Sequence, residues 1–363
     1  MVVLRNWQKQ IIDDFPAIVK KHRRFILKAP TGAGKTILAS EIVEQFYKGK
    51  KILVLCHRLV LLEQLQKALS VRHSVHKLSV SEDGKAFDGY DILLSTNMRA
   101  KDVLEEAIKM ADLIIVDEAH RVSPNGTGYK KIIDDFENEG KIGAQFMGLT
   151  ASPERRTGDQ RDQLSLAFDA IIDCANIETL IEEGILVPPI YRPHFIHDLD
   201  LSSIDISSGD FPVSKLAPAI VKSSMIDYAT YIYMEERQNV PSVPISAWFC
   251  PDVTVAEATL EKIRANGVEA EIVTASTPIT ERMQLLEAHE NGTIEAMVSV
   301  GVLAEGWDNP HCNLVVHLRP TLSKVVWGQT VGRGLRSAEG KDRCIVIDVS
   351  SNWSTFGPVE KLE

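Results

Sequence analysis

Short apolar runs recur along the chain, separated by segments whose apolar residues return every three or four positions. Unbroken runs of Ile, Val and Leu are typical of parallel strands buried on both faces, and the spacing between them is typical of helices. The runs in the first half are RFILKA, KILVLC, DILLST, DLIIVD and QFMGLT, and those after residue 240 are ISAWFC, EAEIVT, EAMVSV, NLVVHL and CIVIDV. The pattern predicts an α/β protein with two parallel sheets in tandem.

Between the two sets lies a stretch without the rhythm of a sheet, VPPIYRPHFIHDLDLSSIDISSGDFP, followed by a helical pattern from about Val213 to Gln238. Its Pro, Ser and Asp content is typical of a connector or a small insertion. We therefore predict a first domain at 1–186, a connector with a linking helix and room for a hairpin at 187–240, and a second domain at 241–363.

Composition narrows the class of protein. Of 363 residues 44% are hydrophobic and 25% charged, and no stretch is long and apolar enough for a membrane span, so we expect a soluble cytoplasmic protein without a membrane partner. The five cysteines are scattered without metal-ligand spacing, which favours buried thiols. A net charge of −10 excludes coating of nucleic acid by bulk attraction but permits a narrow basic track.

The segment APTGAGKT, Ala29 to Thr36, follows one apolar run and precedes a helical pattern. In a P-loop, small residues let backbone N–H groups converge on phosphates at a helix N-terminus, a lysine reaches the β- and γ-phosphates, and a hydroxyl binds Mg²⁺. Lys35 and Thr36 occupy these two positions, although Ala29 stands where the general pattern has glycine. We predict ATP binding here, with a plain turn as the alternative. The predicted loop contacts are Pro30, Thr31, Gly32, Ala33, Gly34, Lys35 and Thr36.

The run LIIVDEAH ends in two adjacent acids at a predicted strand tip. Ligands of parallel sheets bind at the carboxyl ends of the strands. Asp117 can hold Mg²⁺ together with Thr36, and Glu118 can accept a proton from the attacking water. A solvated loop is the alternative interpretation, which the upstream P-loop disfavours.

Together, APTGAGKT and DEAH resemble the superfamily 2 helicases, and further motifs of that superfamily follow in order. LRNWQKQ resembles the adenine-sensing segment (Arg5, Gln8), GLTASPER the coupling motif, SVGVLAEGWDNP the fifth motif, and QTVGRGLR the sixth. The forms GWDNP and QTVGRGLR are most similar to the group containing XPB, RadD and type III restriction motors. This resemblance implies two tandem RecA-like domains with the ATP site in the cleft between them.

The resemblance also implies roles for single residues. Arg333 and Arg336 would act as arginine fingers beside Gln329, and such fingers are typically worth about 10³ to 10⁵ in rate. The remaining implied nucleotide contacts are Glu305, Gly306 and Asp308, and the implied coupling residues are His120, Thr150 and Ser152.

Other strand tips are free to bind a polymer. HRLVLLEQ begins with His57 and Arg58 directly after a strand, at the position of the family's motif Ia. Further candidates are Ser95, Thr96 and Arg99 in STNMR, and Thr274 and Ser276 in VTAST. Hydroxyls and a few basic groups that bind phosphates carry no sequence information, which suits a motor that steps along any strand. For His57 the alternative is a helix cap.

The function expected from these motifs is ATP-dependent translocation or unwinding on DNA by a monomer, with ATP and Mg²⁺ as cofactors. The DNA would be single-stranded or branched and bound independently of sequence. The alternatives are a duplex-tracking remodelling ATPase that does not unwind, and an RNA helicase.

Overall fold

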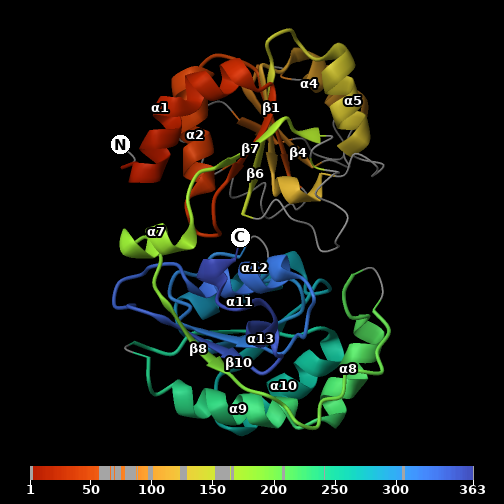
Figure 1. Ribbon diagram of the computed structural model, residues 1–363, viewed down its shortest axis with the longest axis vertical. Coiled ribbons are helices and arrows are strands. Elements are labelled where there is room, and N and C mark those ends of the chain that lie inside the picture. The colour runs from red at the N-terminus through yellow and green to blue at the C-terminus, as the bar shows by residue number, and fades with distance from the viewer. Residues whose placement is uncertain are drawn as a thin grey trace. The chain divides into compact units, whose positions relative to one another are not determined.

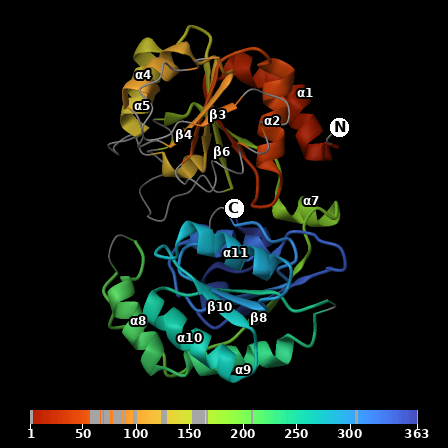
Figure 2. The same ribbon diagram turned by 180° about the vertical axis from the view of Figure 1, so that it is seen from behind.

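The structure of the protein is a computed structural model that describes residues 3–56, 66, 69, 75–77, 87, 89–96, 101–122, 129–151, 164, 167–206, 209–240, 242–304 and 307–362. Its residues form two compact units, Met1–Asn176 and Ile177–Glu363. Each unit is a parallel sheet covered by helices (Figures 1 and 2). No helix within the described ranges is both long and apolar enough to cross a bilayer.

The first unit is built on a parallel sheet of seven strands in the order β3-β4-β2-β5-β6-β1-β7. Its strands are β1 (Arg24–Lys28), β2 (Ile52–Cys56), β3 (Val75–Lys77), β4 (Ile92–Thr96), β5 (Leu113–Asp117), β6 (Gln145–Thr150) and β7 (Ala170–Asp173). Its helices are α1 (Asn6–Lys21), α2 (Lys35–Phe46), α4 (Lys101–Met110), η1 (Ala119–Arg121) and α5 (Tyr129–Glu139).

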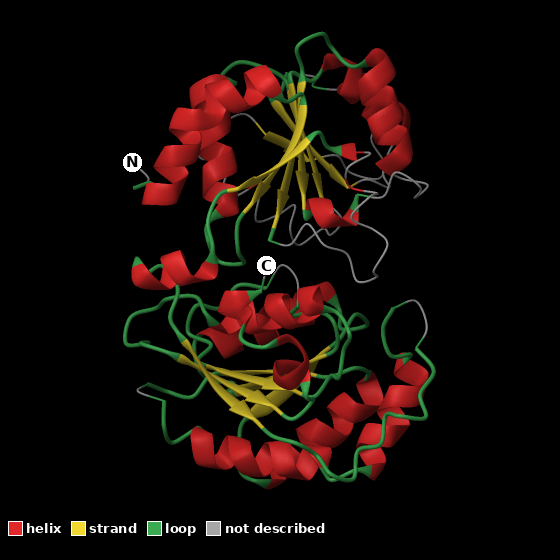
Figure 3. Ribbon diagram, viewed as in Figure 1, coloured by secondary structure: helices red, strands yellow, loops and turns green. Residues whose placement is uncertain are grey.

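Burial explains why these segments are strands. All five residues of β2 are buried, as are four of the five in β5, because helices cover both faces of the sheet. Figure 3 shows α1 and α2 on one face and α4 and α5 on the other. The five predicted strands of this half are all present, and the predicted α/β class is confirmed. The short strands β3 and β7, at the two edges of the sheet, were not predicted.

The second unit has a parallel sheet of six strands in the order β10-β11-β9-β12-β13-β8. Its strands are β8 (Pro189–Pro193), β9 (Ser246–Phe249), β10 (Ala270–Val273), β11 (Ala296–Ser299), β12 (Leu314–His317) and β13 (Cys344–Asp348). Its helices are α7 (Ile177–Glu182), α8 (Val213–Lys222), α9 (Met225–Glu236), α10 (Val253–Ala265), α11 (Ile279–Glu290), α12 (Lys324–Gly334), α13 (Asn352–Phe356) and η2 (Val359–Lys361).

The structure assigns the predicted connector, 187–240, differently from the sequence pattern. β8 is an edge strand of the second sheet, paired with β13, and α8 and α9 pack in the hydrophobic core of that unit. The division between units lies at Asn176 and Ile177, ten residues before the predicted boundary. The sequence pattern does not predict β8 because PIYRP has proline at both ends and lacks a continuous apolar run. Such a strand is tolerated only at the edge of a sheet.

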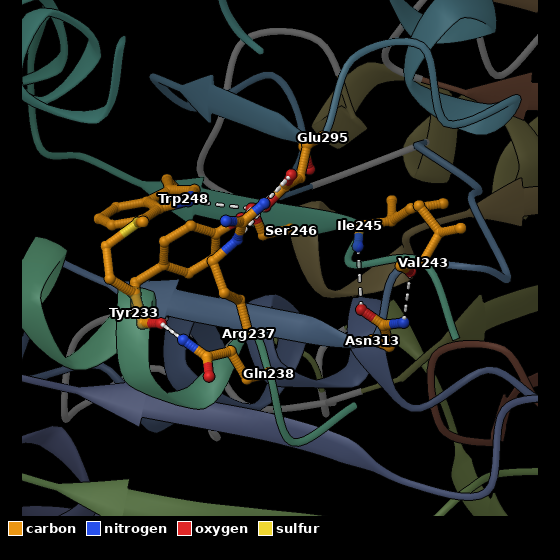
Figure 4. A network of polar contacts seen from close by, with 10 residues as sticks. Tyr233, Arg237, Gln238, Val243, Ile245, Ser246, Trp248, Glu295 and Asn313 are labelled. Carbon is orange, nitrogen blue, oxygen red and sulfur yellow. Dashed lines mark hydrogen bonds and ion pairs between the residues drawn. The ribbon is translucent and has the colours of Figure 1, made fainter. Parts of the chain in front are cut away.

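A polar network lies at the amino ends of the strands of the second sheet (Figure 4). Glu295, directly before β11, accepts hydrogen bonds from the guanidinium of Arg237 and from the Tyr233 hydroxyl at 2.7 Å. Ser246, at the start of β9, donates to the Tyr233 hydroxyl and accepts from the Trp248 indole. Burial beside Glu295 raises the pKa of Tyr233. The network fixes α9 to the sheet and leaves the carboxyl ends of the strands to the candidate functional residues.

Candidate functional site

The carboxyl ends of three adjacent strands bring the first set of predicted residues together. In the order β5-β6-β1, these ends carry Asp117, Thr150 and Ala29. The N–H of Ala29 donates to the carbonyl of Thr150 at 3.0 Å, so the start of the P-loop is joined to the neighbouring strand. Residues far apart in the sequence therefore meet because all strands of the sheet run in the same direction.

The P-loop adopts a conformation that depends on two glycines. Gly32 has φ 80° and Gly34 has φ 97°, both in the left-handed region that glycine tolerates without strain. Gly34 caps the N-terminus of α2, where Lys35 and Thr36 are the first two helical residues. The Lys35 ammonium donates to the carbonyls of Ala29 at 2.9 Å and Pro30 at 3.1 Å, which holds its charge against the loop.

Arg5 and Gln8, at the start of α1, contact the P-loop from the outside. The Arg5 guanidinium donates to the carbonyls of Gly32 at 3.1 Å and Ala33 at 2.6 Å, and the Gln8 amide donates to the carbonyl of Gly34 at 3.0 Å. Gln8 Oε1 accepts the backbone N–H of Arg5 at 2.9 Å, which orients the Gln8 amide at the start of the helix. Arg5 and Gln8 therefore stabilise the conformation of the P-loop, in addition to any contact that they make with the adenine base of a nucleotide.

Asp117 and Glu118 form a pair of acids beside the P-loop. Burial and the charge of Glu118 raise the pKa of Asp117, whereas the charge of Lys35 opposes the rise. Glu118 has φ 52° and ψ 51°, a left-handed conformation that is uncommon outside glycine. This turn sends the chain from β5 directly into η1. Two partly buried carboxylates side by side favour a cation, and carboxylate and hydroxyl oxygens are the ligands that Mg²⁺ prefers.

His120 links the acids to the end of the next strand. Its Nδ1 lies 3.0 Å from Oγ1 of Thr150 and 3.3 Å from Oε2 of Glu118. The imidazole is buried, and the Thr150 hydroxyl is the last side chain of β6. A shift of Glu118 therefore changes the surroundings of the β6 end, which is the contact that a coupling role requires.

The second unit holds the two predicted arginine fingers, Arg333 in the last turn of α12 and Arg336 just after the helix. Arg333, only 4% exposed, donates to the Ala304 carbonyl at 2.9 and 3.1 Å and to the Trp307 carbonyl at 2.8 Å. Arg336 donates to the same Trp307 carbonyl at 3.0 Å and pairs with Asp308 at 2.8 Å. Burial lowers the pKa of Arg336, although an arginine stays charged at any physiological pH. Both guanidinium groups are thus held by the loop that contains the fifth motif.

Gln329 lies one turn earlier on α12. It is 4% exposed, and within the described part of the chain its Nε2 donor has no hydrogen-bond partner. A buried amide donor without a partner costs about 1–3 kcal/mol. This cost would be relieved by an incoming acceptor, such as a phosphate oxygen.

Among the predicted nucleic-acid contacts, the VTAST turn is the one best defined. The hydroxyls of Thr274 and Ser276 lie 2.8 Å apart, and Ser276 is exposed. Arg282 on α11 donates to the carbonyls of Thr274, Ala275 and Thr277 and so fixes the turn. Sequence reasoning missed Arg282, because carbonyl acceptors leave no signature in residue type. Ser95, in contrast, is fully buried in β4.

Several predicted site residues lie outside the described residues. They are His57, Arg58, Arg99, Ser152, Glu305 and Gly306, and for Thr96 only the backbone, at the end of β4, is described.

These features define a class of protein. A P-loop, two adjacent acids at a neighbouring strand end, and a second parallel sheet with paired arginines are the parts of a nucleoside triphosphatase motor. The sequence matches the family "Type III restriction enzyme, res subunit" over residues 1–155 and the family "Helicase conserved C-terminal domain" over residues 231–338.

Individual proteins agree with these family matches. The chain is 27% identical to IRC3 of Saccharomyces cerevisiae, named as a candidate ATP-dependent helicase, over 95% of this chain and 51% of that protein. It is also 27% identical to a 51.5 kDa protein of Lactococcus phage (isolate 7-9), over 92% of this chain and 67% of that protein. The chain thus spans between half and two thirds of the length of these relatives.

Solved structures share the fold. A fragment of a candidate HsdR subunit of a type I restriction enzyme from Vibrio vulnificus YJ016 has a TM-score of 0.74 at 20% identity, over 99% of this chain and 66% of that chain. The helicase domain of Pyrococcus furiosus Hef has a TM-score of 0.58 at 17% identity, over 97% of this chain and 98% of that chain. The chain belongs to the superfamily 2 helicases of the restriction-motor type, and its fold is a tandem of RecA-like units.

Proposed function

We propose that the protein is a DNA-dependent ATPase that uses ATP hydrolysis to translocate along DNA and to separate its strands. The observation that carries the proposal is the assembly at the carboxyl edge of the first sheet, where the P-loop lysine Lys35 follows β1 and the partly buried acids Asp117 and Glu118 lie at the end of β5, with β6 between the two strands. Membership in an ATP-dependent helicase family supports the same activity.

The residues present fit a Mg²⁺ ion that accompanies ATP. Asp117 would hold it together with Thr36, because the raised pKa of Asp117 reflects a buried carboxylate beside a second acid, an environment that a cation relieves. When bound, the ion neutralises charge on the phosphates.

Hydrolysis would then use groups of this chain. Oxygen of a water molecule attacks the γ-phosphorus, the bond from that phosphorus to the oxygen bridging the β-phosphate breaks, and ADP leaves. Glu118 accepts a proton from the attacking water. Lys35 and the backbone N–H groups of the loop stabilise the charge that develops on the phosphoryl oxygens.

Arg333 and Arg336 would supply the remaining positive charge from the second unit. To do so, each guanidinium must exchange a carbonyl of the loop around Trp307 for a phosphate oxygen. A charged acceptor makes a stronger hydrogen bond than a carbonyl, which favours the exchange when ATP is bound. The predicted nucleotide contact Asp308 belongs to the same loop and pairs with Arg336.

The choice of DNA rests on relatives. The matching family is named for a restriction enzyme, and one structure with a TM-score of 0.67 is an ATP-dependent restriction-modification enzyme bound to DNA. Sequence-independent phosphate contacts by the exposed Ser276, and by His57, Arg58 and Arg99, would suit movement along any strand.

The test is steady-state ATPase with single-stranded DNA, duplex DNA and RNA side by side, together with strand separation of a partial DNA duplex. We expect single-stranded DNA to stimulate turnover most and the partial duplex to be separated in an ATP-dependent manner. Lys35→Ala, which removes the main cationic partner of the β- and γ-phosphates, should abolish turnover and leave DNA binding intact. Stimulation by duplex DNA without strand separation would assign a duplex-tracking motor instead, and stimulation by RNA alone an RNA helicase.

A further inference from the structure

Lys341, in the turn between α12 and β13, is a buried lysine whose ammonium is bound by carbonyls. It is 7% exposed, and it donates to the carbonyls of Arg336 at 2.6 Å and Pro310 at 2.8 Å, its partners within the described ranges. Burial lowers its pKa. Lysine is almost never fully buried unless it is paired, because removing its charge from water is costly. The burial of Lys341 therefore suggests that its contacts have a specific role.

The two carbonyls belong to the two segments that hold the arginine fingers. Pro310 lies at the end of the loop that holds the Arg336 side chain. In this loop the Trp307 carbonyl accepts a hydrogen bond from the Arg336 guanidinium, and Asp308 forms an ion pair with the same group. Arg336 therefore contacts this loop through its own side chain. Lys341 connects the backbone carbonyl of Arg336 to Pro310, at the far end of the same loop. Lys341, Arg336 and the loop from Trp307 to Pro310 thus form a closed ring of contacts. In this ring the Lys341 ammonium contacts the carbonyls of both Arg336 and Pro310.

A third segment fixes the backbone of Arg336 from the other side. Leu186 forms an antiparallel bridge with Arg336, and the N–H of Val187 donates to the carbonyl of Leu335 at 2.7 Å. The hydroxyl of Ser337 donates to the carbonyl of Ile185 at 3.0 Å. The chain from 185 to 187 leads into β8. The end of the sixth motif is thus held by residues 185–187, and Lys341 joins the backbone of Arg336 to the fifth-motif loop as well.

We propose that Lys341 is a positioning residue for Arg336, setting where that guanidinium can reach by fixing its backbone carbonyl against the loop at Pro310. The proposal rests on the proposed function, in which Arg336 acts on ATP. A finger stabilises charge in the transition state only at a defined position, and a misplacement of about 1 Å can cost roughly 100-fold in rate.

A purely structural role makes a different prediction. Lys341→Met avoids desolvation of the charge but leaves the carbonyls of Arg336 and Pro310 without this donor, so some loss of stability is expected whichever role the lysine has. If Lys341 served only to stabilise the fold, the folded Lys341→Met variant would keep its turnover. If it positions Arg336, the variant keeps its fold and its affinity for nucleotide but loses turnover.

The experiment compares wild type, Lys341→Met and the control Lys262→Met in DNA-stimulated ATPase, nucleotide titration and thermal unfolding. Lys262 lies on α10 with its side chain 44% exposed and pairs with Asp227 at the surface, so its variant should match the wild type. We expect Lys341→Met to lower kcat by about 10- to 100-fold while the nucleotide Kd changes by less than about threefold. If Lys341→Met does not fold, Lys341→Gln, which can still donate to one carbonyl, is expected to give a smaller loss of kcat.

The double variant with Arg336→Ala tests whether Lys341 acts through that arginine. Lys341→Met should add no further loss to Arg336→Ala, because a residue that acts through another has nothing to position once the other is removed. Losses that multiply would overturn the inference, as would full turnover of Lys341→Met or Lys341→Gln in the presence of an active wild type. A wild type without nucleic-acid-stimulated turnover would instead overturn the proposed function itself.

Discussion

Arg333 and Arg336 are expected to differ in what they contribute, although Arg333 lies in the last turn of α12 and Arg336 only two residues after its end. Arg333→Ala should lower both the stability of the second unit and turnover, whereas Arg336→Ala should lower mainly turnover. The reason is the number and burial of their contacts with Ala304, Trp307 and Asp308. Arg333 is 4% exposed and makes three hydrogen bonds to the carbonyls of Ala304 and Trp307.

The magnitudes follow from what each truncation leaves behind. Hydrogen bonds from a charged donor are worth about 1.5–3 kcal/mol each and are not additive, so removing the three from Arg333 should cost about 2–4 kcal/mol. In Arg336→Ala, the Trp307 carbonyl keeps its bond from Arg333, and Asp308, 58% exposed, returns to water. That loss should be about 1 kcal/mol. For a unit of this size, 1 kcal/mol shifts Tm by about 2–4 °C.

The assay is thermal unfolding by calorimetry, combined with DNA-stimulated ATPase and a nucleotide titration. We expect Tm of the second unit to fall by about 5–15 °C in Arg333→Ala and by about 2–4 °C in Arg336→Ala, with kcat strongly reduced in both. Arg343→Ala is the control, because that guanidinium contacts only the adjacent Asp342 among the described residues and lies at the surface. Equal losses of Tm in the two finger variants, or full DNA-stimulated turnover in both, would refute the reasoning.

Three further predictions concern single groups. Glu118→Gln should keep ATP bound and lower kcat by about 10²- to 10⁴-fold, since an amide cannot take the proton; a wild-type rate in steady-state ATPase would assign the base elsewhere. Gly34→Ala should raise the ATP Kd about tenfold or more, because φ is 97° and the new Cβ would lie 2.9 Å from Nε2 of Gln8, whereas Gly49→Ala, with φ 72° and open space, should leave that Kd unchanged in a nucleotide titration. Burial lowers the pKa of His289 to about 4, so the unfolded chain binds a proton that the folded one does not as pH falls from about 6.5; this group should lower stability by about 1.4 kcal/mol per pH unit between those values, and His289→Gln should show a slope shallower by that amount in denaturant titrations across pH.

The strands that could be predicted from the sequence are the buried ones, because burial on both faces requires a continuous run of apolar residues. β2, β5 and β13 are buried along almost their whole length, and unbroken aliphatic runs state this directly. β7 alternates between exposed and partly buried positions, and β8 has proline at both ends, because edge strands need neither a continuous apolar run nor every backbone N–H. Their place in the sheets depends on partners distant in sequence, which no local pattern contains.

The candidate site divides in the same way. That Lys35 and Asp117 would be neighbours could be predicted, because both follow strands of one parallel sheet. That Arg333, Arg336 and Lys341 are held by backbone carbonyls could not, since every residue offers a carbonyl and the acceptor's identity carries no information. Specific geometry of this kind becomes visible only when the loop and the helix are placed together.

The pairing of β8 with β13 has a consequence for how the protein is made. Pro189 pairs with Cys344, about 150 residues later in the chain, and β13 lies between β8 and every other strand of its sheet. At a synthesis rate of roughly 5–20 residues per second, β8 leaves the ribosome about 8 to 30 s before its partner does. Through that interval β8 cannot complete its hydrogen bonding within the sheet, and unpaired strand edges invite pairing with other chains. The nascent chain is therefore more prone to aggregation than the finished protein, and slower elongation between residues 193 and 344 lengthens its exposure.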